Sequence, residues 1–415
     1  MLTLSGERLP ILKNSSSGEP IYDVATYVVS NLRSTKAANT IESALRAISI
    51  FYTFLDKHRI DLEERLGTGE LLSNGEIDEL VRMCKKPMRA LRNERKDIYP
   101  EVKPQRISTL ENVRMRSPTG VESAEITSGA SRVRQIRNYL DWLANGRFHQ
   151  LSSDSNVRAQ RQKDIARVLK AINARMPSGR SRGTLNARKG IDKETEVRLM
   201  DVITPGNAEN PWKSRDTQVR NRLIIHILIK LGIRRGELLG IRIRDINFQK
   251  LTICIVRNAD SKDDPRKRQP LVKTLSRLLP ITPETASLIS DYVLSHRAGK
   301  FPGLKHDYLI VGNGVRKPLS LIALNKVFEV LRTKCPDLPD FLKPHDLRHT
   351  WNDRYSEIAD SRGMTTATEQ KTRTYMMGWG PTSRMAAVYS LRHTQEEARE
   401  ASLAMQKKLM ERIKK

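Results

Sequence analysis

Apolar residues recur at helical spacing through the first half of the chain. The clearest stripe comprises Ile41, Leu45, Ile48, Tyr52 and Leu55. We expect Asn39 to cap this helix, with Glu42 three residues later. Similar stripes in residues 74–84, 132–144 and 156–175 predict further amphipathic helices. The pattern therefore predicts an all-helical first domain.

The second half mixes helical and strand patterns. Residues 191–203 and 216–232 have helical periodicity, whereas β-branched and apolar runs at 251–256 and 276–281 predict two strands. The loop at 260–268, between these strands, is so polar that we expect it to stay out of the core. The pattern predicts a mixed α+β second domain.

The segment MPSGRSRG, which begins at Met176, has the composition of an interdomain linker. At 415 residues, two domains are expected. The predicted order is a flexible lead-in (1–19), a helical domain (20–175), a basic linker (176–189), a mixed domain (190–395) and a C-terminal helix (396–415).

Charge is the strongest global signal. The chain has 74 Lys and Arg residues but only 47 Asp and Glu residues, which gives a net charge of +27. Such a surplus favours a polyanionic partner, most often DNA or RNA, although a soluble basic protein or a ribosome-associated one is the alternative. Arg132, Arg134 and Arg137 lie off the buried stripe of their helix, which suits either a solvated face or DNA-backbone contacts. The positive charges of Arg180 and Arg182 would suit a linker that lies along the phosphates of a nucleic acid.

The three cysteines, Cys84, Cys254 and Cys335, lie far apart and form no C-x-x-C pair. This spacing argues against a common zinc site and a disulfide framework, and it suits a reducing compartment. The chain has no signal-peptide pattern near its first residue and no apolar stretch of membrane-spanning length. We expect a soluble, cytoplasmic protein.

Candidate chemistry gathers between residues 342 and 390. His345 and Arg348 are three residues apart, so a helix that starts at Pro344 would display both side chains on one face of its first turn. Free backbone N–H groups, the helix dipole and arginine all favour phosphate at such a position. Tyr389 then offers a phenol that can hold a phosphoryl group covalently.

Two upstream segments can complete this site. In LGIRRGEL, Arg234 lies among apolar residues and needs an acidic partner, for which Glu237 is the local candidate. A helix–turn–helix corner with a satisfied ion pair would explain the same residues. Lys273 lies at the start of the second strand, where a lysine can be aimed into a groove, with Lys262 and Lys267 as competitors.

The order of these motifs, GIRRGEL, VKT, HDLRH, GW and a late tyrosine, strongly resembles the tyrosine recombinase (phage integrase) family over residues 190–395. Over residues 20–175 the likeness is looser, and a helical core-binding domain is expected there. The resemblance implies a mainly α protein with a small β-sheet, in which a helical core-binding domain precedes a mixed α+β catalytic domain.

In this family a tyrosine attacks a DNA phosphate, forms a 3′-phosphotyrosyl link and releases a 5′-hydroxyl, without ATP, metal or another cofactor. Arg234 and Arg348 resemble the two guanidiniums that hold the non-bridging oxygens, with Glu237 orienting Arg234. His345 resembles the histidine that assists the tyrosine, here Tyr389, as a base or hydrogen-bond partner.

Lys273 matches the hairpin lysine that protonates the leaving 5′-oxygen. Trp379 falls where most members have a second histidine, and its indole can donate a hydrogen bond but cannot shuttle a proton. The gap from Trp379 to Tyr389 is one residue longer than the commonest family spacing. Tyr355 and Tyr375 are expected to be packing residues.

The resemblance implies a site-specific recombinase or integrase of a mobile element or chromosome-maintenance system, associated with the nucleoid. Its partners would be double-stranded DNA, three further copies of the chain in a synaptic tetramer, and accessory proteins or sister recombinases. Residues 396–415 would dock on their own catalytic domain or on a neighbouring protomer. A type IB topoisomerase, a telomere resolvase and a non-catalytic DNA-binding regulator are the alternatives.

Overall fold

The computed structural model describes residues 7–68, 71–88, 90–91, 121–148, 155–177, 190–257, 261–270, 272, 274–383, 385–389, 398–399 and 401–406. Apart from the first seven residues, the chain divides into two compact units, Arg8–Arg182 and Gly183–Lys415. Each unit has its own hydrophobic core. The described residues are mainly helical with one small β-sheet, which confirms the predicted fold class.

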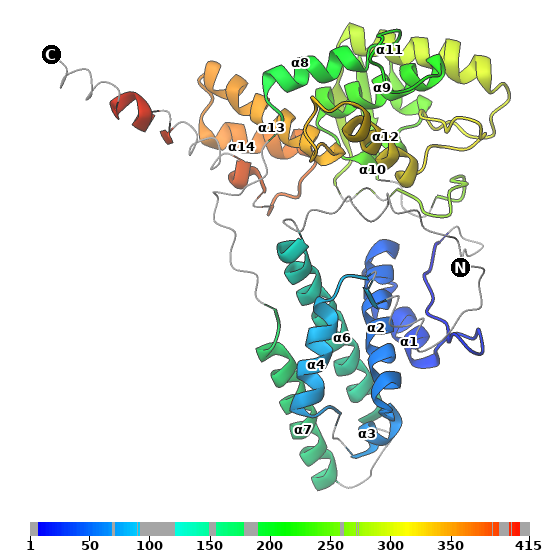
Figure 1. The fold of residues 1–415 in the computed structure, drawn as a ribbon, viewed down its shortest axis with the longest axis vertical. Helices are drawn as coiled ribbons and strands as arrows, with labels where there is room; N and C mark the ends of the chain where they lie inside the picture. Colours follow the sequence, from blue (N-terminus) through cyan, green and yellow to red (C-terminus); the bar gives the residue numbers. More distant parts are fainter. Residues whose placement is uncertain are drawn as a thin grey trace. The chain divides into compact units, whose positions relative to one another are not determined.

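The first unit is a helical bundle in which α2, α4, α6 and α7 pack together (Figure 1). Its described helices are α1 (Tyr22–Tyr27), the π-helix η1 (Val28–Leu32), α2 (Ala38–His58), α3 (Leu62–Thr68), α4 (Asn74–Lys85), α6 (Val121–Phe148) and α7 (Ser155–Ala174). The predicted stripe on α2 is buried as expected, except that Tyr52 is half-buried and bonds the hydroxyl of Tyr139 at 2.8 Å.

The start of α2 differs from the sequence expectation. The helix begins at Ala38, so Asn39 lies inside its first turn and does not cap it. The carbonyl of Ala37 already accepts from the backbone N–H groups of Thr40 and Ile41, which fixes the helix start before Asn39. The cap on α4, by contrast, is a capping box between Ser73 and Glu76.

The second unit surrounds a three-stranded antiparallel sheet, β1 (Ile246–Asn247), β2 (Thr252–Ile255) and β3 (Arg277–Pro280), in which Ile253 pairs with Leu279. Both of these residues are fully buried. The described helices of this unit are α8 (Lys193–Val202), α9 (Arg215–Leu231), α10 (Arg235–Gly240), η4 (Ile243–Asp245), α11 (Pro283–Asp291), the π-helix η5 (Tyr292–Ala298), α12 (Leu321–Lys334), α13 (Pro344–Ser361) and α14 (Thr366–Met377).

The polar loop between β2 and β3 was expected to stay out of the core, but two of its charged side chains are buried. Arg266 donates to both carboxylate oxygens of Asp264 and to the backbone carbonyls of Leu239 and Leu319. A buried ion pair is tolerated when the charges cancel and the remaining donors find partners. Composition alone does not reveal this pairing.

Gly232 ends α9 and lies two residues before the candidate site residue Arg234. It closes α9 in the left-handed conformation, with φ +59°, and its N–H bonds the carbonyl of Leu228. The indole of Trp351 packs directly against it: a Cβ at Gly232 would lie 2.6 Å from Cγ of Trp351. Only glycine therefore lets α9 and α13 approach this closely.

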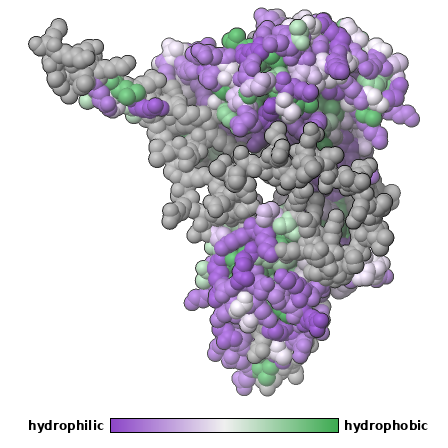
Figure 2. All heavy atoms as spheres, viewed as in Figure 1, coloured by the Kyte–Doolittle hydropathy of each residue, from purple (hydrophilic) through white to green (hydrophobic). Residues whose placement is uncertain are grey.

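Most of the described surface that Figure 2 shows is hydrophilic, with hydrophobic residues scattered rather than gathered in one large patch. None of the helices in the described parts of the chain is long and apolar enough to cross a membrane.

Replacing Gly232 by alanine tests this close packing. A non-glycine residue in the left-handed region costs about 1–2 kcal/mol, and the overlap with Trp351 should add about 1–3 kcal/mol. Gly363→Ala is the matched control, because Gly363 has φ +61° but no atom within 4 Å of the place that a Cβ would occupy. Urea unfolding should show a larger loss for Gly232→Ala; equal losses would contradict the close packing of Trp351.

Candidate active site

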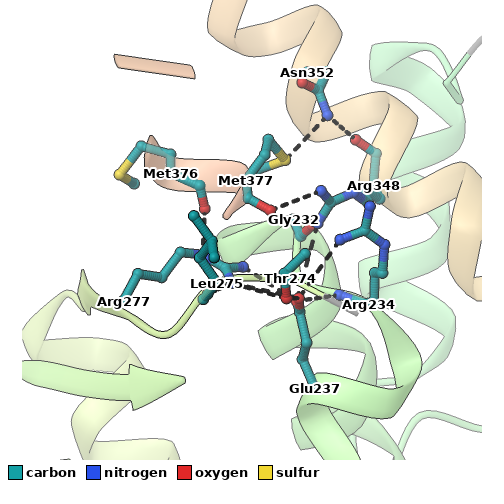
Figure 3. A network of polar contacts seen from close by, with 10 residues as sticks. All are labelled: Gly232, Arg234, Glu237, Thr274, Leu275, Arg277, Arg348, Asn352, Met376 and Met377. Atoms are coloured by element: carbon teal, nitrogen blue, oxygen red, sulfur yellow. Dashed lines mark hydrogen bonds and ion pairs between the residues drawn. The ribbon is translucent and has the colours of Figure 1, made fainter. Parts of the chain in front are cut away.

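Glu237, on α10, is the centre of a buried polar cluster (Figure 3). It is 2% exposed and accepts hydrogen bonds from the backbone N–H of Arg234 (2.8 Å), Nη2 of Arg277 (3.1 Å) and the hydroxyl of Thr274. The side-chain Nη1 atoms of Arg234 and Arg348 lie 3.7 and 4.0 Å from its carboxylate. Segments far apart in sequence thus meet at one carboxylate.

Positive charge is in excess here, since three guanidiniums face one carboxylate. Burial opposes ionisation of Glu237, but the charge and hydrogen bonds of Arg277 hold its pKa below the ordinary value. Burial, followed by repulsion from Arg234, lowers the pKa of Arg348 to about 9. An anion bound in this site would relieve that repulsion, so the cluster is prepared to bind one.

The two arginines predicted for phosphate binding lie in this cluster. Arg348 is 1% exposed, and it donates from Nη1 to the carbonyl of Gly232 (2.7 Å) and from Nη2 to that of Met377 (3.1 Å). Arg234 precedes α10, and its Nη1 atom is buried without a hydrogen-bond partner among the described residues. Because a guanidinium has five N–H donors, both side chains retain donors for a ligand.

Helix α13 begins at Pro344, which confirms the expected helix start. Its first turn borders a cavity of about 540 Å³, a volume within the range of ligand sites. The cavity is lined by Arg234, Arg235, Asn325, Phe328, Arg332, Lys343, Pro344, His345 and Arg348. Six of these nine residues are arginine, lysine or histidine, so the cavity favours an anionic ligand.

Tyr389 ends a short helical turn, residues 385–389, and is 5% exposed. Its ring stacks on Trp379, with centroids 5.7 Å apart and planes 12° apart. Its hydroxyl lies 3.0 Å from Nδ1 of His349. The indole Nε1 of Trp379 is buried and has no hydrogen-bond partner within the described ranges, so one donor beside Tyr389 is available for a ligand.

The charge state of Tyr389 follows from its surroundings. Burial raises the pKa of the phenol, and the guanidiniums of Arg348 and Arg234 offset this effect only in part. The phenol is therefore neutral near pH 7, and the tautomer of His349 decides which of the two side chains donates in their hydrogen bond.

Two contacts differ from the sequence expectations. Glu237 makes its closest guanidinium contact with Arg277, whereas it holds Arg234 mainly through the backbone N–H. The histidine bonded to Tyr389 is His349, whereas His345 lines the cavity. Sequence reasoning missed Arg277 and His349. The available signals were an arginine on the buried face of its strand and a second histidine one turn after the first.

The two other tyrosines near the motifs behave differently. Tyr355 stacks on Trp351 at 5.0 Å, which confirms its packing role. Tyr375, which was also expected to be a packing residue, is 55% exposed.

The predicted DNA-contacting arginines of the first unit lie on α6. Arg132 donates to the carbonyls of Cys84 (2.8 Å) and Lys86 (2.6 Å) and so holds the end of α4. Arg134 is exposed, and Arg137 lies 3.9 Å from a carboxylate oxygen of Asp141. Their contacts with DNA stay a prediction.

Lys273, Arg180 and Arg182 lie outside the described residues. Among the residues that are described, no group of three or more His, Cys, Asp or Glu side chains could hold a metal ion.

Comparison with known proteins identifies the second unit. Residues 191–363 match the model of the phage integrase family, a range that includes Arg234, Glu237, His345 and Arg348 but not Trp379 or Tyr389. A tyrosine recombinase of Pseudothermotoga lettingae is 26% identical over 156 residues, which are 37% of this chain and 46% of that protein.

Tyrosine recombinase XerA of Saccharolobus solfataricus is 26% identical over 180 residues, 43% of this chain and 48% of that protein. The chain thus spans about half the length of each of these relatives. Among solved structures, XerH site-specific recombinase bound to difH substrate has 14% identity and a TM-score of 0.42, covering 94% of this chain and 98% of that chain. These sequence matches relate the second unit of the chain to the phage integrase, or tyrosine recombinase, family.

Proposed function

We propose that this protein is a site-specific DNA recombinase that cuts and rejoins DNA through a 3′-phosphotyrosyl intermediate. The observation that carries the proposal is that Tyr389, a buried tyrosine stacked on Trp379, lies within range of the charges of Arg348 and Arg234. These two guanidiniums face Glu237 in excess charge. A nucleophile beside unneutralised guanidiniums is what attack on a phosphodiester requires.

In the proposed reaction, Arg234 and Arg348 hold the two non-bridging oxygens of the scissile phosphate, and the indole N–H of Trp379 adds a donor. The Tyr389 oxygen forms a bond to phosphorus while the bond from phosphorus to the 5′-oxygen breaks. Lys273 gives a proton to that oxygen. Rejoining reverses these steps with a 5′-hydroxyl as the nucleophile, so the phosphodiester energy is kept and no cofactor is needed.

The proposed substrate is double-stranded DNA. The basic cavity at α10, α12 and α13 supports contact with the phosphate backbone, and the net charge of +27 supports a sequence-independent contribution to affinity. In the first unit, Arg134 and Arg137 are the described candidates for further phosphate contacts, and Arg180 and Arg182 would extend them along the linker.

The family resemblance implies a homotetramer on synapsed DNA and a cytoplasmic, nucleoid-associated role in a mobile element or chromosome maintenance. In that assembly, residues 396–415 would pack on their own catalytic domain or on a neighbour. The side chains of 401–406 are exposed, which leaves their apolar members, such as Leu403 and Met405, open to either arrangement.

Replacing Tyr389 by phenylalanine removes the nucleophilic oxygen and should abolish covalent DNA attachment. On a suicide substrate nicked near the cleavage site, wild type should form an SDS-stable adduct, and Tyr389→Phe should form none while binding DNA normally in a gel shift. Tyr375→Phe, at an exposed tyrosine, is the control and should react like wild type. An adduct that persists in Tyr389→Phe would move the nucleophile elsewhere.

Replacing Lys273 by alanine removes the proposed general acid and should slow cleavage by about 100-fold or more. A 5′-thio leaving group needs no proton, so it should restore the rate of this variant. Lys262→Ala is the control and should cleave at the wild-type rate. Slow cleavage by Lys262→Ala, together with no thio rescue of Lys273→Ala, would transfer the role to Lys262.

Arg277 ties the β3 strand to the site, since it donates from Nε to the carbonyl of Met376 (2.7 Å) and from Nη2 to Glu237. Arg277→Lys keeps the charge but cannot make both bonds. We expect covalent adducts to form about 10- to 100-fold more slowly, because small displacements of reacting groups cost that much. Arg257→Lys, at an exposed position beside the same hairpin, should have no effect. A wild-type rate for Arg277→Lys would contradict this positioning role.

A further inference from the structure

Tyr389 belongs to a series of contacts between aromatic rings and a buried guanidinium. The Trp351 ring stacks on Tyr355, with centroids 5.0 Å apart. The guanidinium carbon of Arg373 lies 5.0 Å from the centroid of the Tyr355 ring and 6.0 Å from that of the Tyr389 ring. Tyr389 stacks in turn on Trp379. Arg373 therefore joins two aromatic pairs, one on α13 and one that contains the candidate nucleophile.

Arg373, on α14, is fully buried and is bonded to both α13 and α14. Its Nη1 donates to the backbone carbonyl of Asn352 (2.9 Å), and its Nη2 donates to the hydroxyl of Ser356 (2.7 Å) and to the carboxylate of Glu369. The side chain of Asn352 donates to the carbonyl of Arg348 at 2.8 Å (Figure 3). These bonds fix the guanidinium and connect it to the helical turn that carries Arg348.

The ion pair of Arg373 and Glu369 is buried beside an apolar cluster. The Tyr389 ring that the guanidinium faces belongs to this cluster, together with Met377 and Trp379. Taking two charges out of water is costly, and apolar residues of similar volume often stabilise a protein equally well or better. The pair is therefore weak evidence for stability, and its position next to Tyr389 favours a role in the chemistry.

We propose that Arg373 is a positioning residue for the nucleophile: its guanidinium supports the Tyr389 ring and favours the phenolate as the oxygen bonds to phosphorus. This inference rests on the proposed function, because it concerns the same cleavage step. A cation over an aromatic face is attracted to the ring, and the attraction grows as the ring gains negative charge. A guanidinium keeps its charge and accepts no proton, so Arg373 acts only through contact and electrostatics.

The charged and titratable groups that face Tyr389 come from three parts of the second unit. Arg234 precedes α10, Arg348 and His349 lie on α13, and Arg373 lies on α14. Burial raises the pKa of the phenol, and the guanidiniums of Arg348, Arg234 and Arg373 lower it, in decreasing order. A bound phosphate would neutralise Arg234 and Arg348. Arg373 would then still favour the phenolate.

Glu369 limits the range of this charge. Because it is paired with Arg373, the two residues together are neutral and add little to the long-range attraction for phosphate. The Tyr389 ring, 6.0 Å from the guanidinium carbon, is within the distance at which a cation acts on an aromatic ring. Removing the cation should therefore disfavour the phenolate, whereas removing only the anion should favour it.

The decisive experiment compares two variants of this pair. Arg373→Met combined with Glu369→Gln removes both charges at similar volume, whereas Glu369→Gln alone leaves the cation without its anion. A fluorotyrosine incorporated at position 389 reports the ionisation of this phenol by fluorine NMR. The midpoint of its titration should rise by about 0.4–1.5 pH units in the double variant, and it should fall in Glu369→Gln.

The rate of covalent attachment should change with the phenol. In single turnovers on the suicide substrate near neutral pH, the double variant should form the adduct about three- to thirtyfold more slowly, because less phenolate is present. Its rate should recover as the pH rises. Glu369→Gln should react at least as fast as wild type. A pair that is only structural would slow both variants at every pH and leave both midpoints unchanged, and this result would overturn the proposal.

The matched control is Arg354→Met combined with Glu357→Gln. These residues form an ion pair on α13, with Nη1 and the carboxylate 2.8 Å apart, but both are partly exposed. This variant should keep the wild-type midpoint and rate. Glu369→Gln preserves the bonds of Arg373 to α13, so it tests the sign of the effect even if the double variant folds poorly. A midpoint in Glu369→Gln that is unchanged or higher would contradict the proposal.

The two measurements separate this inference from the proposed function. If wild type forms no covalent adduct although it binds DNA, the recombinase chemistry itself fails. If wild type forms the adduct but the midpoint of the phenol is the same in all variants, only the role of Arg373 is wrong.

Discussion

The arrangement of the second unit depends on the buried carboxylate of Glu237 and on the ion pair that it forms with Arg277. Burying a charge is costly unless it is paired and fully hydrogen-bonded, and Glu237 meets both conditions through Arg277, Thr274 and the backbone of Arg234. These partners come from β3, from the segment that precedes it, and from the residue before α10. One ion pair thereby ties the sheet to the helices that carry the candidate chemistry.

That pairing also decides which positive charges remain for a ligand. Arg277 is paired with Glu237 and donates a hydrogen bond to the carbonyl of Met376, so its charge is already neutralised. Arg373, whose guanidinium lies near the Tyr389 ring, is neutralised by Glu369. Arg234 and Arg348 are left with charge in excess of their acidic partner. The buried pairs give the site its rigidity, and the excess charge gives it its affinity for anions.

Hydrophobic periodicity predicted much of the fold, because helices that bury one face must repeat apolar residues every three or four positions. The stripe on α2 is buried apart from Tyr52, the predicted helix at 216–232 forms as α9 with a buried apolar face, and α13 begins at Pro344. The same reasoning failed for Asp264 and Arg266, which are buried as a pair inside a polar loop. Periodicity reports the average environment of a segment, whereas an ion pair depends on which side chains meet.

The sequence by itself determined the helical first unit, the mixed second unit, the excess of positive charge and the ordered motifs that contain Arg234, Arg348 and Tyr389. Only the tertiary structure decided that Arg277 is the closest guanidinium to Glu237 and that His349 is bonded to Tyr389. The reason is geometric. Residues four apart on a helix share a face, so spacing cannot choose between His345 and His349. The packing of the turn that carries Tyr389 against α13 makes that choice.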